Sequence, residues 1–182
     1  MMRPSITPAA LAALVAIGAL GALAALPAAA ALDEHLAPLA PFVGHAYTAH
    51  MSPPGAEPAV VDVQLWEEIL GGKAVRITHS INGGDYGGES LITWDETKQS
   101  LIYFYATTAT FHTVGTVYVA GDSLLTDEQV VGEAGEIAEV KGVTRRTADG
   151  MVVRTQQLVR GQWLPHRSTT YVETPGAVPT FR

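Results

Sequence analysis

The chain has 182 residues, with 11 Lys and Arg against 18 Asp and Glu, a formal net charge of −7 and no Cys. The acidic balance disfavours nucleic acid as a partner, because binding to phosphates needs a dense basic face. The lack of Cys excludes disulfides, thiolate metal sites, a Cys nucleophile and lipid attachment at a lipobox cysteine. The length suits one domain with a core of ordinary size.

Residues 1–31 have the composition of a secretory signal peptide. Arg3 is their only charge, and an Ala/Leu-rich run is followed by Pro27 and a string of four alanines. A basic start, an apolar centre and a small-residue end are typical of cleaved leaders. An uncleaved anchor is the alternative, because the run approaches spanning length, but it is mostly Ala and no basic cluster follows it. We predict cleavage after Ala30 or Ala31, a periplasmic or secreted protein, and no membrane span after cleavage.

The mature chain is expected to start with a short helix. Apolar residues recur near helical spacing over residues 32–43, and two acidic residues stand where a helix dipole favours negative charge. Pro38 and Pro41 limit such a helix to a turn or two. We expect it to lie as a lid or plug over one end of the following structure.

After Gly44 the apolar period becomes two, which indicates β-strands. Turn signals rich in Gly, Asn and Asp, such as residues 82–85, separate these segments. The expected strand segments are 61–69, 75–81, 90–94, 101–105, 111–119, 123–131, 136–147, 151–159 and 163–173. Nine or ten strands without intervening helices predict an antiparallel sheet that closes up-and-down or folds into a sandwich. A closed barrel of this width leaves an interior cavity. One domain spans residues 32–182, and its tail, 175–182, is expected to be loosely held.

Short motifs then suggest a family. Residues 35–44 (HLAPLAPFVG) resemble the helix that leads into the first strand of calycin-type barrels. The chain is similar to nitrobindin-like haem-binding proteins and to exported bacterial lipocalin-like proteins of unknown function. Residues 71–76 (GGKAVR), 86–89 (YGGE) and 94–95 (WD) resemble the second group more closely. This resemblance covers the mature chain in strand order and implies a lipocalin-like, up-and-down β-barrel of about ten strands with a short N-terminal helix.

The resemblance to nitrobindin-like proteins also raises the possibility of haem as a cofactor. Their haem-bearing histidine lies on the last strand, where this chain has His166. Their first strand carries a G-x-W-x-G pattern, whereas here Gly44 is followed by residues 45–49 (HAYTA). A haem site would need His166 to point into an apolar interior.

Strand alternation makes several histidines and carboxylates candidates for the barrel interior. His79 shares its face with apolar residues, so it is either a ligand-binding or basic group or a core histidine bonded to a hydroxyl. His112 alternates with Val114 and Tyr118, and faces either the cavity or the solvent. Glu89 and Glu67 are either paired inward carboxylates, with Arg76 or Lys73 as partners of Glu89, or solvated surface residues.

Aromatic residues on the expected strands could line a cavity with apolar walls and polar tips. The nominated ligand-binding residues are Trp66, His79, Glu89, Tyr103, Tyr105 and His112. Metal-binding and hydrolase motifs such as H-E-x-x-H and G-x-S-x-G do not occur in the sequence. We therefore expect an exported barrel that holds a small apolar or amphipathic molecule. The alternatives are a nitrobindin-like haem protein, a cavity enzyme in which His79 or His112 pairs with Glu89, and a fully packed interaction protein.

Overall fold

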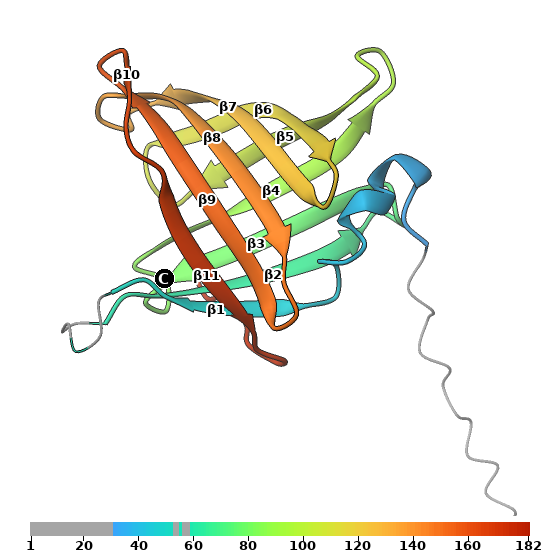
Figure 1. Ribbon diagram of the computed structural model, residues 1–182, viewed down its shortest axis with the longest axis horizontal. Helices are drawn as coiled ribbons and strands as arrows, with labels where there is room; N and C mark the ends of the chain where they lie inside the picture. Colours follow the sequence, from blue (N-terminus) through green and yellow to red (C-terminus); the bar gives the residue numbers. More distant parts are fainter. Residues whose placement is uncertain (1–30, 53–54, 56–58) are drawn as a thin grey trace, which may run out of the picture.

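The computed structural model describes residues 31–52, 55 and 59–182, so the predicted leader lies outside the described residues except for Ala31. The described chain forms one antiparallel sheet that closes into an up-and-down barrel (Figure 1). Its strands are β1 (Ala46–His50), β2 (Val61–Ile69), β3 (Ala74–Ile81), β4 (Tyr86–Asp95), β5 (Ser100–Thr107), β6 (Phe111–Ala120), β7 (Ser123–Gly132), β8 (Ile137–Arg146), β9 (Gly150–Val159), β10 (Gln162–Trp163) and β11 (Arg167–Glu173). This arrangement confirms the predicted all-β barrel with a short N-terminal helix.

Closure depends on the last long strand. Strands β1 to β9 pair in chain order, and β11 pairs with both β9 and β1, which makes a ring of ten strands. The two-residue strand β10 pairs with β9 only. The sequence predicted a single strand over 163–173, but residues 164–166 leave the ladder between β10 and β11. Pro165 explains the break, because proline has no N–H to donate to a neighbouring strand.

The turn between β3 and β4 has the conformation that its sequence predicts. Asn82, Gly83 and Gly84 all have positive φ angles, 49°, 67° and 106°. Gly84 is also restricted by space, because a Cβ there would lie 2.9 Å from backbone atoms of Thr180 and Arg182. The turn therefore needs glycine both for its backbone angles and for contact with the C-terminal tail.

That contact corrects the expectation of a loose tail. The Thr180 amide donates to Ser80 Oγ at 3.0 Å, and the Arg182 guanidinium lies 2.6 Å from an Asp85 carboxylate oxygen. The end of the chain is thus held at the rim formed by β3 and β4. Figure 1 shows this C-terminus at the opposite end of the barrel from the N-terminal helix.

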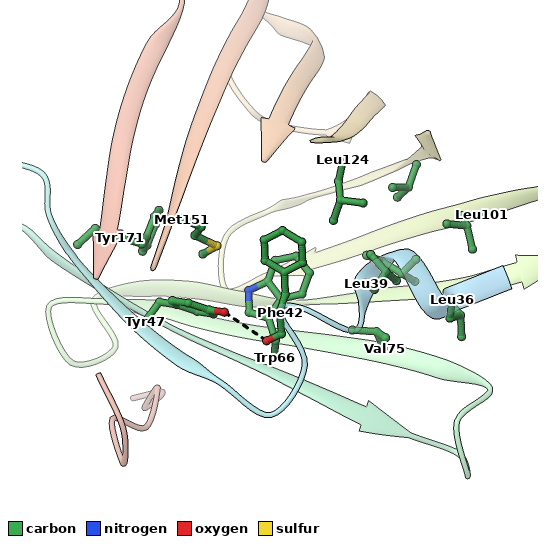
Figure 2. Close-up of a cluster of buried hydrophobic side chains, with 13 residues drawn as sticks. Leu36, Leu39, Phe42, Tyr47, Trp66, Val75, Leu101, Leu124, Met151 and Tyr171 are labelled. Atoms are coloured by element: carbon green, nitrogen blue, oxygen red, sulfur yellow. Dashed lines mark hydrogen bonds between the residues drawn. The ribbon is translucent and has the colours of Figure 1, made fainter. Parts of the chain in front are cut away.

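The N-terminal helix plugs one end of the barrel. The 3-10 helix η1 (Glu34–Leu39) is shorter than the predicted 32–43, and its Leu36 and Leu39 side chains are fully buried. Phe42, which follows it, stacks on Trp66 of β2 with ring centroids 5.0 Å apart. Figure 2 shows these side chains together with inward residues of several strands, including Val75, Leu101, Leu124 and Met151. The hydrophobic core of the barrel is therefore at this end.

Polar contacts hold the plug against the barrel wall. Asp33 caps the helix by accepting from the His35 amide, and its carboxylate lies 2.7 Å from Lys73 Nζ. The Lys73 ammonium, and then the hydrogen bonds from His35, hold the pKa of Asp33 well below its usual range. The His35 ring stacks on Trp94 with centroids 4.0 Å apart. Among the described residues, no helix is long and apolar enough to cross a membrane.

We predict that Leu36→Ala lowers the free energy of unfolding by about 2–5 kcal/mol, because it leaves a void in the packed end of the barrel. Urea unfolding followed by circular dichroism measures this change. Leu70→Ala is the matched control, because Leu70 is 73% exposed and should change stability by no more than about 0.5 kcal/mol. Equal effects of the two substitutions would show that η1 does not fill the core.

Candidate functional site

A cavity of about 330 Å³ occupies the barrel interior above the hydrophobic core. Side chains from every barrel strand except β1 line it, and the core residues Trp66, Ile92, Val117 and Leu124 form its floor. Its upper walls carry hydroxyl, carboxylate, amide and imidazole groups. This volume lies at the small end of the range for small-molecule sites in proteins, about 300–1,000 Å³.

The first polar cluster of the cavity is centred on Asp62 of β2. Its carboxylate accepts the Tyr171 hydroxyl at 2.6 Å and the Gln64 amide at 3.4 Å, and His79 Nδ1 lies 3.0 Å away. The Asp62 side chain is almost fully buried, at 4% exposure. A carboxylate can remain in such a place because three groups hydrogen-bond to it.

The cluster continues from His79 through two tyrosines. His79 Nε2 lies 2.6 Å from the Tyr105 hydroxyl, which lies 2.9 Å from the Tyr86 hydroxyl. When the imidazole is neutral, Nδ1 carries the ring hydrogen that Asp62 accepts, and Nε2 accepts from Tyr105. Tyr86 then donates to Tyr105, and its oxygen offers its lone pairs to the cavity.

The second polar cluster surrounds Glu128 of β7. Its two oxygens accept the Thr113 hydroxyl at 2.6 Å and the Thr126 hydroxyl at 3.0 Å. Burial raises the pKa of Glu128, and the two hydrogen bonds offset part of this effect. Gly142 of β8 leaves room for the cluster, because a Cβ there would lie 2.5 Å from the Thr126 hydroxyl oxygen.

The tyrosines of the cavity are held in their protonated form. Burial is the main cause that raises the pKa of Tyr86, Tyr103 and Tyr105, and Tyr103 also hydrogen-bonds to Ser90 at 2.9 Å. The nearby Glu128 carboxylate raises the pKa of Tyr103 and Tyr86 further. Neutral phenols therefore face a cavity that contains two carboxylates and one imidazole.

Four of the six nominated ligand-binding residues line this cavity, and two do not. Trp66, His79, Tyr103 and Tyr105 face inward. Glu89 is exposed on the outer face of β4. His112 lies outside the cavity lining, with its ring 5.4 Å from that of the exposed Phe104. The pairing of His79 or His112 with Glu89 inside the cavity therefore does not occur, because His79 faces inward while Glu89 and His112 are both on the outer face.

Two further candidate residues also lie outside the cavity. Glu67 lies on the outer face, where it pairs with Arg76 at 2.9 Å, so Arg76 is not a partner of Glu89. His166 is exposed in the loop between β10 and β11 rather than on the last strand. The residues present do not fit a haem held by His166, because its side chain is outside the cavity lining.

Sequence reasoning missed Asp62, Tyr86, Glu128 and Tyr171. In β2, the inward residues are the polar Asp62 and Gln64, and the apolar Val61 and Val63 alternate with them. Period two identifies the two faces of a strand but not which one is inward. The available signal was Asp62 and Gln64 on the same face as Trp66, a pattern that suits a partly polar interior.

No protein-family model matches the chain, and no curated protein is significantly similar to it. The barrel is compatible with a lipocalin or calycin-like fold. The described residues contain no group of three or more His, Asp or Glu side chains placed to hold a metal ion. The cavity lining is therefore the main indication of function.

We predict that Tyr171→Phe lowers the free energy of unfolding by about 1.5–3 kcal/mol, because it removes a buried hydrogen bond to a charged acceptor. Chemical denaturation measures the change. Tyr118→Phe removes a hydroxyl from a ring that is 49% exposed, and serves as the control. A stability loss no greater than that of the control would contradict the central role of Asp62.

We also predict a pH-dependent effect of Glu128→Gln. Because the pKa of Glu128 is raised in the fold, the native state holds this proton at pH values where the unfolded chain has lost it. Stability from this group is therefore lost as pH rises from the ordinary value of 4.5 through the raised pKa. The groups facing it are Thr113, Thr126, Tyr103 and Tyr86.

Glu128→Gln should thus be more stable than the parent near about pH 8, with the difference closing towards about pH 4. Thermal unfolding across this range tests it. Glu89→Gln, on the outer face, should show no such trend. A gain from Glu128→Gln that grows as the pH falls would have the wrong sign.

Proposed function

We propose that this protein binds a small amphipathic molecule inside its barrel. The observation that carries the proposal is the division of the interior: η1 fills one end, while the space above the core is lined by aromatic rings and two built polar clusters. An apolar pocket with a few placed polar groups is typical of small-molecule sites. Tyr86 lines the cavity and ends one of these clusters with its hydroxyl group.

Binding is favoured over acid–base catalysis by the state of His79. A His–carboxylate pair does line the cavity, as the enzyme hypothesis required, but with Asp62 rather than Glu89. Both ring nitrogens are engaged by protein groups, which leaves neither of them free for a substrate. Any proton transfer would have to pass through Tyr105, whose pKa burial raises. The hydrogen-bonded chain of Asp62, His79, Tyr105 and Tyr86 is suited to holding these side chains in fixed orientations around a ligand.

The proposal includes export of the protein. Its support is the leader-type composition of residues 1–31, with a single charge before an Ala/Leu-rich run. The ligand would then be a molecule of the periplasm or the medium. Fold alone does not choose among ligands, because barrels of this shape have many functions.

Titration with the uncharged dye N-phenyl-1-naphthylamine tests the proposal. Its emission should rise saturably as the dye leaves water for the cavity. Thr155→Trp on β9 places a large ring among the cavity-lining residues and should weaken binding by about tenfold or more. The matched control, Thr170→Trp, puts the same ring at an exposed position of the neighbouring strand β11.

The control variant should bind like the parent protein. Absence of saturable binding by the parent would overturn the proposal. Equal losses in the two variants would also contradict it, because the dye would then not occupy the interior.

A further inference from the structure

The charges of the cavity lining are unbalanced. Two carboxylates, Asp62 and Glu128, face it together with one imidazole, and no Lys or Arg side chain of the described residues lines it. A carboxylate away from bulk water is stabilised by a cation or by several hydrogen bonds. The two carboxylates differ in how many hydrogen bonds they accept from the protein.

Asp62 is satisfied by the protein. It receives the Tyr171 hydroxyl, the Gln64 amide and the His79 ring hydrogen, and the Gln64 carbonyl in turn accepts the Trp66 indole N–H at 3.3 Å. Little hydrogen-bonding capacity is left for another group. We therefore assign Asp62 to the internal network.

Glu128 keeps unused capacity. A carboxylate has about four acceptor positions, and the structure shows one hydroxyl donor on each oxygen, from Thr113 and Thr126. Both donors are neutral. The other carboxylate lone pairs are available to a group inside the cavity, and a cationic donor there would supply the charge that the lining lacks.

The remaining surroundings suit the same kind of group. With the His79 imidazole neutral, the Tyr86 oxygen offers the cavity an acceptor. The floor and walls carry the rings of Trp66, Tyr103, Tyr105 and Phe111, whose electron-rich faces attract cations. An anionic ligand would meet two carboxylates and no Lys or Arg side chain of the described residues.

From this geometry we infer that the ligand of the cavity is a small organic amine, bound as its ammonium form. Glu128 forms the ion pair, Tyr86 can accept a further ammonium hydrogen, and the aromatic walls and apolar floor hold the hydrocarbon part. This inference rests on the proposed function and adds the chemical class of the ligand to it.

A matched series of three compounds tests the inference. 4-Phenylbutylamine, 4-phenylbutan-1-ol and 4-phenylbutanoate share one hydrocarbon body and differ only in the charge of the end group. Calorimetric titration at neutral pH should show the amine binding about tenfold or more tighter than the alcohol, since a charged hydrogen bond adds that much. The carboxylate should bind most weakly.

Glu128→Gln should remove the preference, bringing the ratio of amine to alcohol affinity close to one. Glu89→Gln, which neutralises an exposed carboxylate on the outer face, should keep the ratio of the parent. The ratio in the parent protein is informative by itself, so the test does not depend on a single variant.

The outcomes separate the two proposals. If the uncharged dye binds but the amine has no advantage over the alcohol, the amine assignment fails and the binding function stands. A preference for the carboxylate, or an amine preference that survives Glu128→Gln, also overturns the assignment. If neither the dye nor any of the three compounds binds, the proposed function itself fails.

Discussion

Closure of the ten-stranded sheet is the constraint on which the rest of this structure depends. A ring of this size encloses more space than its inward side chains fill. One end is filled by η1 and Phe42, which pack on Trp66 and the apolar residues around it. The plug supplies a hydrophobic core while the interior at the other end stays open. The hydrophobic core that stabilises the fold and the cavity that could hold a ligand thus lie at opposite ends of the barrel.

The open part is kept in order by polar contacts rather than by packing. Among the described residues, no buried side-chain nitrogen or oxygen lacks a hydrogen-bond partner. The chain from Tyr86 through His79 to Asp62 has one consistent direction when the imidazole is neutral. Such networks hold side chains in defined positions because each broken bond leaves a buried polar group unsatisfied. The cavity is therefore shaped in advance of any ligand.

The two ends of the barrel are also secured from outside. Lys73 and Trp94 hold the segment that carries the plug, through Asp33 and His35. At the other rim, Ser80 and Asp85 hold the C-terminal residues. Both tethers involve the hairpin of β3 and β4, which also contributes His79 and Tyr86 to the cavity. This hairpin connects the plug, the polar network and the end of the chain.

The sequence by itself determined the fold class, the plug and the strand segments from β2 to β9, because these follow from local periodicity and turn residues such as 82–85. It also predicted His79 and Tyr105 as candidate ligand-binding residues, and both line the cavity. Only the tertiary structure decided which face of each strand is inward, and so placed Asp62 and Glu128 inside and Glu89 and His112 outside. The physical reason is that alternation separates the two faces of a strand without saying which one is inward. Where the interior is partly polar, the rule that the apolar face is the inward one fails.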